Sequence, residues 1–353
     1  MQYFVLILFL LVPLTIYIFF KKNRKMTYKD EVLELLKKTD INEGDIFDFG
    51  ETPHEHEFAE TYQFYRGILT WASKYDVKSS SIFFQNDTSP NARAKTFNKH
   101  GVIAITSGLM IRQINDFLKN EELDKKLKER FEKIHPFLDN PIHVLMYQQV
   151  QHSTFYHELG HLIQQSEELQ NWMQETSTSN NFSLTRHKLE LDADSFSALS
   201  LAAHIQQYGF KIFGETIDTE KMELLVELFS ATVLLYFLTF SNAKREIYYE
   251  ENSHPHPLVR IINVLLIISD YLGKSPKLSK KGIIINPRKI IRGTIDLVEK
   301  IESEIFKNEK SDDLNIILSK NKTEIINYFT KLRAHKVEDC REASDVWNEK
   351  IPT

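Results

Sequence analysis

The chain has 353 residues, of which 42% are hydrophobic, and a formal net charge of -5. A chain of this length and hydrophobic content can form the core of one large domain or of two smaller ones. The negative net charge argues against nucleic acid as a partner. Cys340 is the only cysteine. An intramolecular disulfide is therefore excluded, which fits a reducing compartment.

The first twenty residues, 1–20, contain no charged side chain and precede the basic cluster Lys21-Lys22-Asn23-Arg24-Lys25. About twenty helical residues span the hydrocarbon core of a bilayer, so 1–20 is predicted to be a transmembrane anchor. A cleavable signal peptide is disfavoured because its positive charge would come before the apolar run. Since basic clusters stay on the cytoplasmic side, we expect a single-pass membrane protein with its main body in the cytoplasm.

A juxtamembrane segment is expected at 21–57, with a short amphipathic helix at 28–38. It ends in His54-Glu55-His56-Glu57, interpreted as an exposed loop rather than a second metal site. A longer, aromatic-rich helix is expected at 58–75. It would begin a domain assigned to 58–275.

A short strand is predicted at 102–106, because Val102, Ile103 and Ile105 are β-branched residues that follow Gly101. Thr106 would end the strand as the N-cap of a helix. Helical patterns follow at 111–127 and 144–165.

The most informative residues are His157-Glu158-Leu159-Gly160-His161, inside the second of these helices. Residues four apart share a helix face, so His157 and His161 can bind one metal ion. Glu158 lies about 100° round the axis. There it can act as general base towards water at the metal. The pattern predicts a site for one Zn²⁺ ion.

A catalytic zinc site needs a third protein ligand. Glu190 and Asp194 share one face of a predicted helix, whereas Asp192 points nearly the opposite way. Glu190 is therefore the favoured third ligand, and Asp194 is placed to accept the ring N–H of a ligating histidine. His187, one turn before Glu190, is the competing third ligand.

These residues resemble the membrane-associated gluzincin peptidases that include the CAAX prenyl protease and the HtpX heat-shock protease. Three further motifs carry the resemblance, which covers about residues 80 to 265: Asn91-Ala92-Arg93-Ala94 with the strand and Gly108-Leu109-Met110, Glu190-Leu191-Asp192-Ala193-Asp194, and His254-Pro255-His256-Pro257-Leu258-Val259-Arg260-Ile261. The resemblance implies an α+β, zincin-like metallopeptidase domain, mostly helical with a small sheet.

The same resemblance implies a protein or peptide substrate whose extended backbone binds along the strand by β-augmentation. It assigns substrate binding to Asn91, Ala92, Val102, Ala104 and Thr106. It also suggests that His254 or Arg260 stabilises the oxyanion formed from the substrate carbonyl. Because His256 also precedes a proline, which of the two histidines enters the site stays open.

Family members usually cross the membrane several times, and 224–240 is the best candidate for a second span. It contains Glu227, and its uncharged part is too short for a bilayer. It is interpreted as a buried core helix. A loop is expected near 273–287. Residues 276–353 are expected to form a C-terminal helical region, with helical spacing from about 288 to 335.

The sequence thus predicts a membrane-anchored, zinc-dependent endopeptidase. Two alternatives remain open. One is a toxin-like or abortive-infection protease specific for one cytoplasmic protein, as in the phage-exclusion peptidase Lit, which a single anchor suits. The other is a non-catalytic membrane scaffold with a structural zinc. The oligomeric state is left open.

Overall fold

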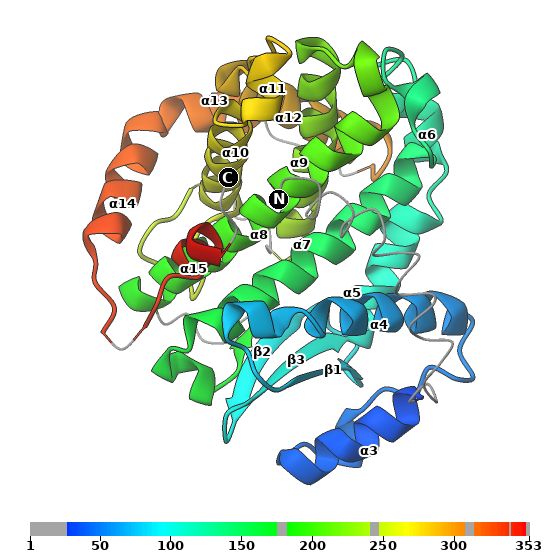
Figure 1. Ribbon diagram of the computed structural model, residues 1–353, viewed down its shortest axis with the longest axis vertical. Coiled ribbons are helices and arrows are strands. Elements are labelled where there is room, and N and C mark those ends of the chain that lie inside the picture. Colours follow the sequence, from blue (N-terminus) through cyan, green and yellow to red (C-terminus); the bar gives the residue numbers. More distant parts are fainter. Residues whose placement is uncertain (1–26, 175–181, 241–246, 308–313, 339, 351–353) are drawn as a thin grey trace.

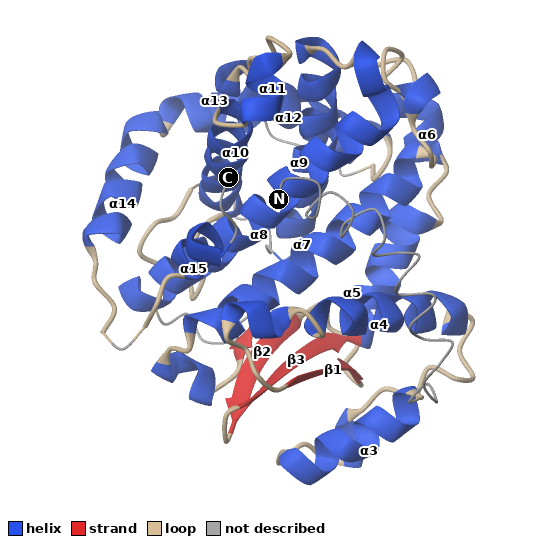
Figure 2. Cartoon of the chain, viewed as in Figure 1, coloured by secondary structure: helices blue, strands red, loops and turns tan. Residues whose placement is uncertain are grey.

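The computed structural model describes residues 27–174, 182–240, 247–307, 314–338 and 340–350. The predicted anchor at 1–20 and the basic cluster that follows it lie outside these residues. Among the residues described, helices dominate and a small sheet lies at one end of the molecule (Figures 1 and 2). The expected α+β architecture, mostly helical with a small sheet, is therefore confirmed.

The described sheet has four strands, in the order β1 (Ser80–Gln85), β3 (His100–Thr106), β2 (Ala92–Phe97) and β4 (Met173–Gln174). β1 runs parallel to β3, whereas β2 is antiparallel to both of its neighbours. The strand expected at 102–106 is β3, and it is buried along its whole length. It occupies the centre of the sheet, so its backbone is hydrogen-bonded on both sides.

Helices cover both faces of this sheet (Figure 1). Side chains alternate along a strand, so Val102 and Ala104 of β3 pack towards one face with Leu35, while Ile103 and Ile105 enter the main core on the other. The first face is covered by α3 (Tyr28–Lys38), and the second by α4 (Glu55–Leu69) and α7 (Ile142–Gln164).

Helices α7 and α8 (Leu184–Phe213) pack against each other in the centre of the molecule (Figure 1). Helix α7 ends at Gln164, because the next residue, Gln165, has a left-handed φ of 50°. Gly160 permits the close packing, because a Cβ built there would lie 3.0 Å from the Cα of Ala193. This contact brings the face of α7 that carries His157 against the face of α8 that carries Glu190.

Helix α9 (Thr219–Phe240) contains the apolar stretch at 224–240. It is long and apolar enough to cross a membrane, but 78% of its most apolar window is buried in the protein. It packs against α7, α8, α10 (Pro257–Gly273) and α12 (Pro287–Glu304). Its Glu227 pairs with Arg130 at 2.6 Å. Within the structure α9 is therefore a core helix.

The C-terminal region packs onto the same core. Ile295 and Ile301 of α12 belong to the hydrophobic cluster that includes α7 and α8, as do Val346 and Trp347 near the chain end. The other helices of this region are α11 (Pro276–Lys280), α13 (Leu314–Lys320), α14 (Lys322–Ala334) and α15 (Ala343–Lys350).

Several local expectations are corrected. His56 and Glu57 lie in the first turn of α4 rather than in a loop, and α4 gives way to a 3₁₀ turn at Ala72–Tyr75. The loop expected at 273–287 contains α11, and α15 lies in the expected C-terminal helical region but beyond the helical spacing at 288–335. The pattern at 111–127 divides into α5 (Ser107–Gln113), a π-helix (Ile114–Leu118) and α6 (Glu122–Leu127).

Because α7 and α8 touch at Gly160, we expect Gly160→Val to lower the free energy of unfolding by about 1–3 kcal/mol, the usual cost of forcing methyl groups into a packed core. Urea unfolding of the purified chain measures this. Gly273→Val, at the end of α10, is a matched control because a Cβ there meets no atom within 4 Å. Equal losses in the two variants would contradict the close contact.

Candidate metal centre

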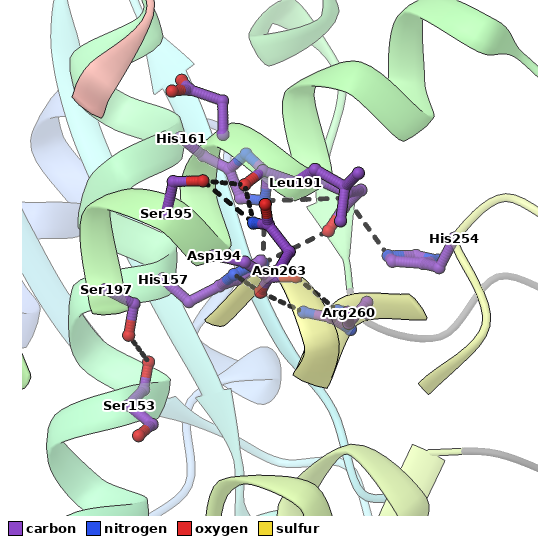
Figure 3. A network of polar contacts seen from close by, with 12 residues as sticks. Ser153, His157, His161, Leu191, Asp194, Ser195, Ser197, His254, Arg260 and Asn263 are labelled. Carbon is purple, nitrogen blue, oxygen red and sulfur yellow. Dashed lines mark hydrogen bonds and ion pairs between the residues drawn. The ribbon is translucent and has the colours of Figure 1, made fainter. Parts of the chain in front are cut away.

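The predicted ligands His157, His161 and Glu190 come together where α7 meets α8, and we call them the metal triad. Figure 3 labels its two histidines. The Nε2 atom of His157 lies 3.1 Å from Nε2 of His161 and 3.2 Å from Oε2 of Glu190. The third edge, from Nε2 of His161 to Oε1 of Glu190, is 3.6 Å. Ligand atoms of a tetrahedral zinc ion lie about 3.3–3.4 Å apart. The buried triad therefore fits one ion.

Each histidine of the triad is held through its other ring nitrogen. Nδ1 of His157 lies 2.9 Å from Oδ1 of Asp194, and an ionised carboxylate can only accept, so this nitrogen carries the proton. Nδ1 of His161 lies 3.1 Å from Oε1 of Gln164. In neutral imidazoles both Nε2 atoms then present lone pairs to each other, beside a carboxylate. A cation between them would remove this repulsion.

Arg260 of α10 binds Asp194 (Figure 3). Its Nε and Nη2 atoms each donate to one oxygen of that carboxylate at 2.8 Å. Burial raises the pKa of Asp194, but Arg260 and His157 outweigh this effect and lower the pKa below its usual value. The observed role of Arg260 is therefore to hold Asp194, the carboxylate beside His157. Its expected role at the oxyanion stays a prediction.

His254 is the histidine of the His-Pro motif that enters the site. Its Nε2 lies 3.2 Å from Oε1 of Glu190, and its Nδ1 lies 2.9 Å from Oγ of Ser253. His256 instead caps α10, where its Nδ1 accepts the N–H of Leu258 at 3.1 Å. The choice left open by the sequence is therefore decided in favour of His254.

His187, the competing third ligand, is held outside the metal triad. Its Nδ1 lies 2.5 Å from the hydroxyl of Tyr328 and its Nε2 lies 3.0 Å from the carbonyl of Asn252. Burial lowers the pKa of His187 to about 4, so the ring is neutral near pH 7. Glu190 rather than His187 therefore completes the triad.

Both glutamates of the site are buried. Burial raises the pKa of Glu190, but His254 and His161 outweigh it and hold the pKa well below the usual value. Glu158, next to His157 on α7, is 1% exposed. Burial lowers the pKa of Arg93 on β2. Nearby negative charges, including that of Glu158, partly offset this effect by raising the pKa. Both carboxylates of the site are thus removed from solvent.

The expectation that the substrate backbone pairs with β3 is wrong, because β1 and β2 occupy both edges of that strand. The side chains of Val102 and Ala104 pack on the face covered by α3. Thr106 is the expected N-cap, since its hydroxyl accepts the N–H of Leu109 at 3.2 Å. These three residues therefore build the scaffold.

Asn91 and Ala92 lie at the start of β2, on the strand next to β3. The far edge of β2 is paired with β4 only at Arg93 and Ala94 in the described chain. Both Asn91 and Ala92 are buried, and Asn91 is hydrogen-bonded to Thr106 through its backbone. Of the strands in the sequence motif, β2 rather than β3 has an edge on which some backbone groups pair with no strand in the described part of the chain.

One cavity lies away from the metal triad, against the C-terminal helices. It measures about 600 Å³ and lies between α8, α10, α14 and α15, where Leu191 and Asp192 line it from the face of α8 opposite to Glu190. The space beside His157 measures only about 10 Å³. In the described part of the chain the triad is thus enclosed by protein.

Sequence reasoning missed Gln164, which binds the ring of His161. The available signal was its position three residues after His161, on the same side of α7. A glutamine at this spacing is common in helices, so only the observed contact identifies its role.

Comparisons with models of protein families, with curated proteins and with solved structures found no match for this chain. The class of site is therefore defined by the residues themselves. It is a buried group of two imidazoles and one carboxylate that can hold a metal ion.

The ion pair between Arg260 and Asp194 yields a stability prediction. We expect Arg260→Met to lower the free energy of unfolding of the metal-free chain by about 3–5 kcal/mol, because it leaves a buried carboxylate without its counter-charge. Arg292→Met is the control, since Arg292 is exposed and lies 3.8 Å from Asp296. That change should cost less than about 0.5 kcal/mol. Similar urea midpoints for the two variants would refute the buried pair.

His187 yields a pH prediction. Burial lowers the pKa of His187 from 6.5 to about 4. Between pH 6.5 and pH 4 the unfolded chain therefore binds a proton at His187 that the folded chain does not bind. Stability from neutral His187 is therefore lost as pH falls, by up to about 1.4 kcal/mol per pH unit. We expect the difference in unfolding free energy between wild type and His187→Gln to shrink between about pH 6.5 and 4. A pH-independent difference would contradict a buried, neutral ring.

Proposed function

We propose that the protein is a zinc-dependent endopeptidase of the gluzincin type, with a zincin-like core made of α7, α8 and the sheet. The supporting observation is the metal triad itself, with Glu158 beside it on α7. Two histidines and one glutamate are a ligand set found in catalytic zinc sites, which keep one position open. Ca²⁺ and Mg²⁺ prefer oxygen ligands and fit this set less well.

Each residue of the site would have a separate role in the hydrolysis. When bound, Zn²⁺ would supply Lewis-acid activation of water and of the substrate carbonyl. Glu158 would accept a proton from the attacking water and deliver it to the leaving amine. His254, beside Glu190, would donate a hydrogen bond to the carbonyl oxygen as negative charge develops there. Asp194 would keep the proton of His157 on Nδ1.

The substrate class in this proposal is a protein or peptide in extended conformation. We assign its backbone to the outer edge of β2, beyond the two residues that pair with β4, because hydrogen-bonding groups on this edge can extend the sheet. The single membrane anchor and the cytoplasmic location of the catalytic domain are part of the same proposal. They rest on the sequence of residues 1–25.

A non-catalytic scaffold with a structural zinc is the second candidate. Two observations favour it: the triad is enclosed, and His254 lies 3.2 Å from Glu190, where it could serve as a fourth ligand. A closed set of four protein ligands is typical of structural zinc. Stoichiometric zinc without any peptide cleavage by the wild type would support this candidate.

Peptidase activity is tested with Glu158→Gln. We expect the zinc-loaded wild type to cleave members of an unbiased peptide library, and Glu158→Gln to lower kcat by about 10²–10⁴-fold, the usual contribution of a general base. Products are identified by mass spectrometry. Zinc content should stay unchanged, because Glu158 is not a ligand.

The matched control is Glu132→Gln, which alters an exposed glutamate far from the metal triad in the sequence. It should leave turnover unchanged. Full turnover by Glu158→Gln would remove Glu158 from the mechanism. Mass spectrometry of terminal peptides from cells that express the wild type or Glu158→Gln would also show whether the enzyme cuts one protein or many. A single dominant fragment with growth arrest would support a toxin-like protease.

A further inference from the structure

The end of the chain reaches the metal triad through a continuous series of hydrogen bonds. These run from the start of α15 to Asp192 on α8, from Asp192 to Gln164 on α7, and from Gln164 to the ring of His161. The participating side chains are buried. The contacts therefore form a specific connection in the protein interior.

Asp192 connects α15 to α8. Its Oδ2 atom accepts the N–H of Ala343 at 2.6 Å, and its Oδ1 atom accepts the N–H and the hydroxyl of Ser344 at 3.2 and 2.7 Å. The first N–H groups of a helix have no partners within the helix and attract negative charge. Asp192 is thus the N-terminal cap of α15, although it lies far away in the sequence.

Gln164 connects Asp192 to the metal triad. Its Nε2 atom donates to Oδ2 of Asp192 at 2.9 Å and to the carbonyl of Leu189 at 2.7 Å. Since both of these partners are acceptors, the nitrogen end of the amide faces them and Oε1 faces His161. The ring proton of His161 is therefore held on Nδ1, and the lone pair of its Nε2 is directed towards the triad.

Arg341 fastens the same segment to the end of α7. Its Nε donates to the carbonyl of Ile163 at 2.7 Å, and its backbone N–H donates to the carbonyl of Gln164 at 3.3 Å. Its Nη2 donates to the carbonyl of Tyr75 at 2.6 Å. Carbonyls in the last turn of a helix lack partners within it. The C-terminal segment therefore holds both the backbone and the side chain of Gln164.

We propose that residues 341–350 are a positioning element of the metal centre, which acts through Asp192 and Gln164 to keep Nε2 of His161 directed at the metal. His157 has a separate support, the Asp194 carboxylate held by Arg260. Each histidine is thus oriented by a different helix, α10 for His157 and α15 for His161. The inference rests on the metal-binding part of the proposed function and not on peptidase activity.

The first test compares Gln164→Met with Gln149→Met in the full chain. Both glutamines are buried in α7, but the amide of Gln149 donates to Ser153 at 3.1 Å. Zinc dissociation constants from chelator competition and the Co²⁺ absorption spectrum are the readouts. We expect Gln164→Met to weaken zinc binding about 10–100-fold and to change the spectrum, as loss of a partner behind a metal ligand usually does. Gln149→Met should bind zinc as tightly as wild type.

The second test asks whether the C-terminal segment acts through Gln164. Asp192→Asn replaces a carboxylate oxygen by an amide, and it should weaken zinc binding in the wild-type background. In the Gln164→Met background it should add little further loss, because both changes break the same connection. Fully additive losses would overturn the proposed route from α15.

The outcomes separate this inference from the proposed function. If Gln164→Met lowers the melting temperature but binds zinc as tightly as wild type, Gln164 only packs and the inference is overturned. If the wild type binds zinc but cleaves no peptide, the peptidase proposal fails while the comparison of zinc affinities still stands. If the wild type takes up no zinc, both proposals fail.

Discussion

The close contact between α7 and α8 at Gly160 is the constraint on which the metal centre depends. The two imidazoles belong to α7 and the carboxylate belongs to α8, so one ion can reach all three only if the helices pack tightly. A glycine facing Ala193 provides the necessary room. Helix α9 and the sheet then enclose α7 on its other sides. The fold therefore serves to hold two helix faces together.

Burial of so many polar groups has a physical cost that shapes the surroundings of the triad. A charged group removed from water is tolerated only when it is paired or hydrogen-bonded. Asp194 is paired with Arg260, and Asp192 accepts hydrogen bonds from α7 and from α15. These compensating contacts also orient the histidines. The same interactions that make burial possible thus direct the ligand atoms towards one point.

The sheet has a smaller role than the family resemblance implies. Its β-branched strand, β3, lies in the centre and is paired on both edges, so it supports α7 and cannot bind a substrate backbone. In the described chain β2 is paired with β4 only at Arg93 and Ala94, and the rest of this edge is where we propose that a peptide binds. The β-branched composition of β3 cannot distinguish a central strand from one at the edge, because both can have buried side chains.

The sequence by itself determined the local part of the site. Helical spacing places His157 with His161 and Glu190 with Asp194, because residues four apart share a face in any helix. Only the tertiary structure decided that Arg260 binds Asp194, that His254 rather than His256 reaches Glu190, and that Asp192 caps α15. The residues in that last contact are 152 positions apart. Such pairings depend on how helices pack, and no periodic pattern within one helix records them.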